Sequence, residues 1–154
     1  MKLAVKRINK TYNMNADRIF ILASSIAFIS WSLLFIYPYS SRIRQILYGG
    51  VVTCFSLLYT GLLISYFDPE SFQSFSTLSG LISLFSNKEA VLLGWIHYLA
   101  FDLLAGLYIS KDAEKNKLGP WIIRPMFFFT FMTGPLGFLL YTIIRTVKVR
   151  KYNF

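Results

Sequence analysis

The sequence predicts an all-α protein, a polytopic membrane four-helix bundle with a short interfacial amphipathic helix between the second and third spans. Apolar residues make up 55% of the 154 residues, while charged residues make up only 15%. Most charges fall between apolar blocks, and four blocks have the roughly 20 apolar residues that are needed to cross a ~30 Å hydrocarbon core. The predicted spans cover residues 17–37, 46–67, 90–109 and 125–144.

The segments between these spans are too short to bury a second core, so residues 1–154 are expected to form a single transmembrane domain. The net charge is +9, which in a soluble protein would suggest nucleic-acid binding. Here the basic residues flank the apolar blocks, as expected for side chains that face anionic headgroups. We therefore expect membrane lipids as partners and no nucleic acid.

The first two spans form a hairpin with helix-breaking residues at both ends. Asp17 is a candidate N-cap, Pro38 ends the first span, and Pro69 follows the second. Segment 71–86 then has apolar residues at three- to four-residue intervals, the pattern of an amphipathic helix that is too short and polar to span a bilayer. It either lies in the headgroup plane or folds over the bundle, and the sequence leaves both alternatives open.

The third and fourth spans form a second hairpin around the polar segment 110–124, where Trp121 and Arg124 are candidate interfacial anchors. Pro125 opens the fourth span, and Gly134-Pro135 predicts a kink at its middle. Gly134, Gly137, Tyr141 and Arg145 are expected to share one face of this span.

The distribution of Lys and Arg predicts the orientation. With four spans, ten basic residues lie on the side of the termini and six lie on the other side, so both termini are expected to be cytoplasmic. Arg145 then falls at the membrane end opposite the 110–124 segment. Asp112 and Arg124 meet at the end that contains this segment, where they are expected to pair.

Two ionisable residues, His97 and Asp102, lie within the third span, where polar groups are costly and often functional. At 100° per residue, Asp102 shares a face with Trp95, Tyr98 and Gly106, whereas His97 lies about 140° away. Counting inward from the loop places Asp102 opposite Thr133-Gly134 and His97 near Phe138. The two side chains are not expected to touch, but they are positioned to line two sides of one cavity.

These positions give a functional and a structural interpretation of the second hairpin. In the first, Asp102 and His97 are catalytic proton donor and acceptor, and five residues bind substrate: Trp95, Tyr98, Thr133, Gly134 and Tyr141. In the second, Asp102 hydrogen-bonds neighbouring groups and only locks the bundle. Structural roles are assigned to Gly106, Pro135, Gly137, Asp112, Arg124 and Arg145.

Metal and cofactor chemistry are not indicated. One His and one Cys are too few for a metal cluster. The sequence has no Gly-rich phosphate loop and no dinucleotide-binding motif. We therefore expect no metal and no cofactor.

Two strings in the second hairpin resemble a known family. They are Trp95-Ile-His-Tyr-Leu-Ala-Phe-Asp-Leu103 and Thr130-Phe-Met-Thr-Gly-Pro-Leu-Gly137. Together with the run from Phe75 to Phe85, they are similar to the abscisic-acid-deficient-4-like family of integral membrane proteins, over roughly residues 17–146. Plant members form neoxanthin from violaxanthin, so the resemblance implies a cofactor-free isomerisation of a carotenoid epoxide that needs a proton donor, an acceptor and a dry pocket.

The resemblance further implies a bacterial member in the inner (cytoplasmic) membrane. Two functions are carried forward: an isomerase of a carotenoid or related isoprenoid lipid, and a non-catalytic protein that binds lipid or pigment. A transporter subunit is a weaker alternative, because four spans without repeats would require a homo-oligomer.

Overall fold

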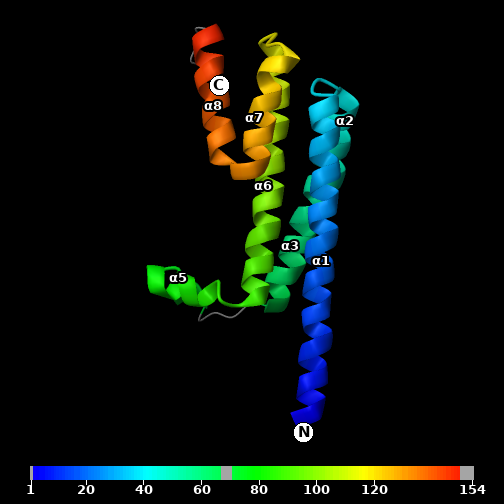
Figure 1. Cartoon of the computed structure of the whole chain (residues 1–154), viewed down its shortest axis with the longest axis vertical. Coiled ribbons are helices and arrows are strands. Elements are labelled where there is room, and N and C mark those ends of the chain that lie inside the picture. Colours follow the sequence, from blue (N-terminus) through cyan, green and yellow to red (C-terminus); the bar gives the residue numbers. More distant parts are fainter. Residues whose placement is uncertain (1, 67–70, 150–154) are drawn as a thin grey trace.

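The computed structural model describes the backbone of residues 2–66 and 71–149, and side chains in 16–66 and 72–149. Every regular element in these ranges is helical (Figure 1). The helices are α1 (Lys2–Ile36), α2 (Ser41–Ile46), the π-helical segment η1 (Leu47–Val52), α3 (Thr53–Tyr66), α4 (Ser71–Ser74), α5 (Leu78–Leu84), α6 (Lys88–Lys115), α7 (Pro120–Thr133) and α8 (Pro135–Val149).

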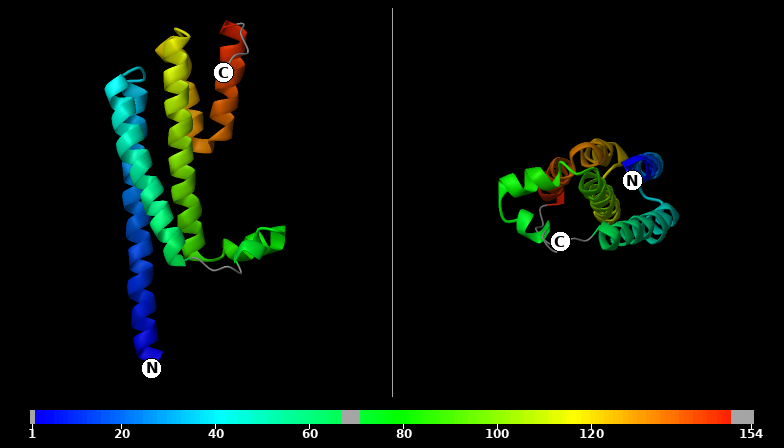
Figure 2. Two further views of the ribbon diagram at one scale, coloured as in Figure 1. Left: turned by 180° about the vertical axis from the view of Figure 1, so that it is seen from behind. Right: turned by 90° about the horizontal axis from the view of Figure 1, so that it is seen from below.

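Three helical stretches in the described ranges are long and apolar enough to cross a bilayer, namely Ala16–Ile36, Ser41–Tyr66 and Lys88–Lys115. They correspond to the first three predicted spans. Helix α6 is central, with α1 and α3 on one side and α7 and α8 on the other (Figures 1 and 2). Helices α1 and α6 approach closely at Gly106, where a Cβ atom would lie 2.5 Å from the Trp31 ring.

The prediction of a single fourth span over residues 125–144 is wrong. Helix α7 ends at Thr133, Gly134 turns the chain, and α8 runs back beside α7 (Figures 1 and 2). Gly134 has φ +54° and ψ −89°, a conformation that side chains disfavour, and Pro135 has no N–H with which to extend α7. The expected kink is therefore a complete reversal.

The α7–α8 hairpin is shallow and tightly packed. Its helices have 14 and 15 residues, so each is about 21–23 Å long, less than the ~30 Å hydrocarbon core. A Cβ atom at Gly137 would overlap with the backbone nitrogen and hydroxyl of Thr130, so only glycine permits this approach. The observed architecture is thus three helices that are long and apolar enough to span a bilayer and one hairpin of two shorter helices.

This reversal also corrects the predicted topology. Helix α8 ends at Val149, at the same end of the bundle as the α6–α7 connection, while α1 begins at the opposite end (Figure 1). The prediction of one shared side for both termini does not fit the described ends of the chain, Lys2 and Val149. It assumed that residues 125–144 cross the membrane once.

The amphipathic segment forms α4 and α5 and does not fold over the bundle. Helix α5 extends away from the start of α6, on the same side as α8 (Figures 1 and 2). Thr77 caps α5 by accepting a hydrogen bond from the Gly80 amide at 3.1 Å. Five apolar side chains of segment 71–86 are exposed, which favours the interfacial alternative: Phe72, Phe75, Leu78, Ile82 and Phe85.

Candidate functional site

Asp102 lies at the centre of the candidate site, on the side of α6 that meets the α7–α8 turn. The residue is 8% exposed, and within the described part of the chain its Oδ2 atom has no hydrogen-bond partner. A Cβ atom on Gly134 would overlap with Oδ1 of Asp102, so the carboxylate lies directly against the turn. The predicted register of Asp102 opposite Thr133-Gly134 is confirmed.

The α7–α8 turn provides a polar environment for this carboxylate. The Gly134 amide donates to the Thr130 carbonyl at 2.8 Å and ends α7. Pro135 begins α8, so the first backbone amides of this helix have no carbonyl group one turn earlier in α8 to accept their hydrogen bonds. The negative end of the α7 dipole and the positive end of the α8 dipole therefore meet at this turn, beside Asp102.

Two aromatic side chains precede Asp102 on α6, as the helical periodicity predicted. Tyr98 interacts electrostatically with the Asp102 carboxylate. The Tyr98 ring stacks on Trp95 with 5.7 Å between centroids and 24° between planes. Trp95 is held in place because its Nε1 donates to Ser24 Oγ on α1 at 2.9 Å.

His97 lies apart from Asp102, on the α3 side of α6. The His97 side chain is exposed, and its ring centroid lies 5.8 Å from Tyr59 and 4.6 Å from Phe101. The prediction that His97 lies near Phe138 is wrong, because the chain reverses at Gly134 before it reaches the depth of His97. The Phe138 ring lies beside Tyr108 instead, with 5.8 Å between the ring centroids. The structure therefore does not bring His97 and Asp102 into one cavity.

Thr133 and Tyr141, two predicted substrate-binding residues, also point elsewhere. The Thr133 hydroxyl donates to the Phe129 carbonyl within α7 at 2.8 Å. Tyr141 is fully buried and donates to Asp112 Oδ2 at 2.5 Å, several turns from Asp102. Of the predicted substrate-binding residues, Tyr98, Trp95 and Gly134 remain grouped with Asp102.

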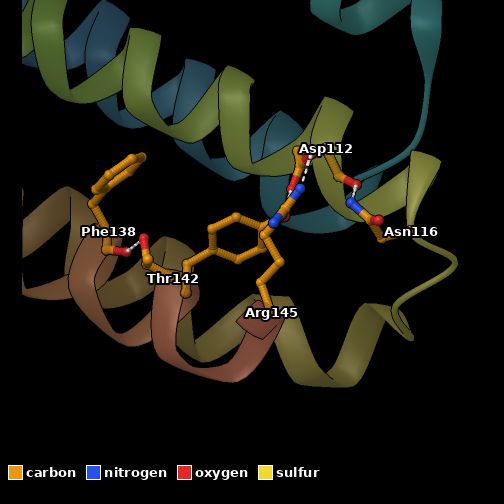
Figure 3. Close-up of polar contacts among 6 residues, drawn as sticks. Asp112, Asn116, Phe138, Thr142 and Arg145 are labelled. Carbon is orange, nitrogen blue, oxygen red and sulfur yellow. Dashed lines mark hydrogen bonds and ion pairs between the residues drawn. The ribbon is translucent and has the colours of Figure 1, made fainter. Parts of the chain in front are cut away.

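Asp112, Tyr141 and Arg145 form a second polar cluster, which fastens α8 to α6. Figure 3 shows Arg145 of α8 and Asp112 of α6 in this cluster. Arg145, only 3% exposed, donates from Nε to Asp112 Oδ2 at 2.5 Å and from Nη2 to Oδ1 at 3.4 Å. Of the four residues predicted to share one face of the fourth span, Gly137, Tyr141 and Arg145 are all buried on α8, whereas Gly134 lies in the preceding turn. The predicted placement of Arg145 at the opposite membrane end is wrong because α8 reverses direction.

The predicted Asp112–Arg124 pair is also wrong. Arg124 instead donates from Nε to the Phe35 carbonyl on α1 at 3.3 Å. Its guanidinium lies 4.4 Å from the Trp121 ring centroid and 5.8 Å from that of Phe35, both within cation–π range. Arg124 thus joins α7 to α1.

A further polar network lies at this end, and no sequence pattern predicted it. Arg44 pairs with Glu114 and donates to Ser110 Oγ at 3.2 Å. Tyr39 donates to the Leu118 carbonyl. Burial, and secondarily the nearby Glu114 carboxylate, raise the pKa of Tyr39, so its hydroxyl remains a donor at neutral pH. Only the folded chain brings these residues together, since the partners are 66–79 positions apart in the sequence.

A separate apolar groove of about 380 Å³ lies between α1 and α7. Four of its lining residues are Phe28, Trp31, Phe127 and Phe131. The Nε1 atom of Trp31 is buried and has no hydrogen-bond partner in the described part of the chain. The groove is suited to an apolar ligand, but it lies on the α1 side of α7 rather than at the α7–α8 turn.

The described residues contain no group of three His, Cys, Asp or Glu side chains that converge as metal ligands. His97 and Asp102 face different neighbours, and Cys54 is an exposed thiol on α3. The chemistry of the candidate site therefore centres on one carboxyl group and its aromatic neighbours.

With this geometry established, comparison with known proteins identifies the family. The profile of ABA DEFICIENT 4-like proteins matches residues 18–141, well over half of the chain. The chain belongs to the ABA DEFICIENT 4-like family. The match includes the three spans, most of the α7–α8 hairpin and Asp102. No curated protein and no solved structure matches the chain.

Proposed function

We propose that this ABA DEFICIENT 4-like protein is an intramembrane isomerase of a carotenoid epoxide or a related isoprenoid lipid, with Asp102 as its acid and base. The observation that carries the proposal is Oδ2 of Asp102, which is buried beside the α7–α8 turn and has no hydrogen-bond partner among the described residues. An unpaired polar atom in a bilayer interior is costly, and a functional role explains why it is retained.

One carboxyl group can balance the reaction that the family resemblance implies. Protonated Asp102 donates its proton to the epoxide oxygen as the ring C–O bond breaks, which makes a hydroxyl group and a delocalised cation. The resulting carboxylate then takes the proton from the adjacent polyene carbon, and the C–H electrons form the new double bond of the allene. Asp102 ends protonated as it began, and no oxidant or reductant is consumed.

This mechanism differs from the Asp102–His97 pair expected from the sequence. His97 is exposed beside Tyr59, so we assign it no proton-transfer role. Exclusion of water by the bilayer protects the cation from hydrolysis.

The proposal can be tested with purified protein in proteoliposomes containing violaxanthin, with product followed by chromatography. The wild type should form the allenic isomer, Asp102→Asn should not, and His97→Ala should retain activity. Asp17→Asn is the matched control, because Asp17 is an exposed carboxylate paired with Lys88. Product formation by Asp102→Asn at the wild-type rate would contradict the proposal.

A non-catalytic protein that binds lipid or pigment is the second candidate function, and the α1–α7 groove favours it. The groove is almost entirely apolar and aromatic, suited to a polyene or acyl chain. Mass spectrometry of lipids that co-purify from the native membrane addresses both functions. In the binding-only case, Phe131→Ala should reduce pigment occupancy and Asp102→Asn should not; recovery of bulk phospholipid alone would argue against a carotenoid ligand.

A further inference from the structure

We infer that the ligand of Asp102 reaches it laterally from one half of the bilayer, the half between α5 and the α7–α8 turn. This inference rests on the proposed role of Asp102 and adds a direction of access. The path is the face of α6 formed by Val91, Gly94, Tyr98 and Asp102, hereafter the Tyr98 face. These residues recur at three- and four-residue intervals, so they form one stripe along the helix.

Different helices cover different parts of α6. Helices α7 and α8 meet α6 from Asp102 onward, as the contacts of Gly134 with Asp102 and of Arg145 with Asp112 demonstrate. Before Asp102, α3 packs on another side of α6, at His97, whereas α1 borders the Tyr98 face at Trp95. The Tyr98 face therefore lies between α5 and the α7–α8 hairpin, and Val91 on this face is 46% exposed.

The position of α5 sets the depth of Asp102 in the bilayer. Helix α5 lies at the start of α6, and a Cβ atom on Gly94 would be 2.9 Å from the Phe85 ring, so the end of α5 adjoins the Tyr98 face. The eight positions from Gly94 to Asp102 rise about 12 Å along the helix. With α5 in the headgroup plane, Asp102 lies near the middle of a ~30 Å hydrocarbon core.

The polar and aromatic groups at the end of this path indicate the chemistry of the ligand. Phospholipid acyl chains have no polar atom at mid-bilayer, so they cannot pair with Oδ2 of Asp102. The complementary ligand is a long apolar lipid with an oxygen-bearing end group that lies at this depth. The stacked rings of Tyr98 and Trp95 present an aromatic surface beside the carboxylate, and Ser24 fixes that surface. A cyclic isoprenoid end group with an epoxide or hydroxyl oxygen meets these requirements.

Photo-crosslinking tests the inference without relying on turnover. The probe is an isoprenoid chain with a diazirine beside a terminal cyclohexane epoxide, in phosphatidylcholine vesicles that contain the wild-type protein. Labelled residues are mapped by mass spectrometry. We expect labelling to concentrate on Val91 and Tyr98, and to fall when the untagged epoxide is added.

Blocking variants supply the matched control. Val91→Trp should abolish labelling at Tyr98, whereas Leu57→Trp, at a 69% exposed position on α3, should leave it unchanged. Labelling concentrated in the α1–α7 groove, or spread equally over the exposed face of α3, would overturn the inference.

The outcomes also separate this inference from the proposed function. If the probe labels the Tyr98 face of a protein that forms no product, the result would support lateral access and contradict isomerisation. Product formation with labelling elsewhere would contradict lateral access and leave the isomerase proposal standing.

Discussion

Arg145 of α8 donates from Nε to Oδ2 of Asp112 on α6 at 2.5 Å, and this ion pair fixes the direction of the last described helix. An α8 that continued across the bilayer from α7 would place Arg145 at the other membrane surface. Because α8 turns back at Gly134, Arg145 returns to the end of α6 where Asp112 lies. The same reversal places the start of α8 beside Asp102.

The first prediction concerns this buried pair. Arg145→Ala should lower the free energy of unfolding by about 3–5 kcal/mol, because it leaves the charge of Asp112 without its main partner. Tyr141→Phe should cost less, about 1.5–3 kcal/mol, since it removes one hydrogen bond to a charged group. Chemical unfolding in detergent micelles measures both.

The exposed Asp17–Lys88 pair is the matched control for that measurement. Its side chains are 60% and 45% exposed, so Lys88→Ala should change the free energy of unfolding by only about 0–1 kcal/mol. Equal effects of Lys88→Ala and Arg145→Ala would show that the Asp112 cluster does not fasten α8 to α6.

The second prediction concerns the two glycines of the hairpin. Gly137→Ala should strongly destabilise the protein, because its Cβ would overlap with Thr130 of α7. Gly134→Ala should also destabilise it, through its positive φ and through overlap with Asp102.

A third glycine provides the control. Gly61 on α3 has open space around its Cβ position, so Gly61→Ala should be neutral or stabilising by up to about 1 kcal/mol. Thermal unfolding in detergent compares the three variants. A Gly137→Ala protein as stable as Gly61→Ala would be incompatible with the tight α7–α8 contact.

The third prediction concerns topology. In a Cys54→Ser background, which removes the single native thiol, cysteines at Lys117 and Lys148 should react with an impermeant maleimide from the same side of sealed vesicles. A cysteine at Ser76 should react from the other side. Four full spans would instead place Lys148 and Ser76 together, so the labelling pattern decides between the two arrangements.

The fourth prediction assigns the sides. Among the described residues, the α6–α7 end holds eight basic residues, namely Arg42, Arg44, Lys111, Lys115, Lys117, Arg124, Arg145 and Lys148, and the other end holds six, Lys2, Lys6, Arg7, Lys10, Arg18 and Lys88. The excess predicts that the α6–α7 end is cytoplasmic. Lys117→Cys should therefore be protected from impermeant maleimide in intact cells and Ser76→Cys labelled. The reverse pattern would contradict this assignment.

Much of the scaffold could be predicted because hydropathy and helical periodicity are local properties. They identified three spans, the face shared by Gly137, Tyr141 and Arg145, and the depth of Asp102 opposite Gly134. These features depend on segment length and on angles around one helix.

The reversal at Gly134 could not be predicted from the same signals. A Gly-Pro pair in an apolar block is compatible with a kink or a turn, and hydropathy is the same for one long helix or two short antiparallel ones. The prediction of a kink instead of a turn placed Phe138 near His97. It also placed Arg145 far from Asp112, so that Arg124 was predicted as the partner of Asp112. Long-range partners such as Arg44 and Glu114 likewise depend on helix packing.

The measurement that tests the central claim most directly is the stability and activity of Asp102→Asn, determined on the same preparation. If Asp102 is retained for proton transfer despite an unpaired buried oxygen, this variant should unfold at the wild-type temperature or higher and form no isomerised product. An Asp102→Asn protein that unfolds at a lower temperature yet retains wild-type product formation would show that Asp102 holds the bundle together and does not carry the chemistry.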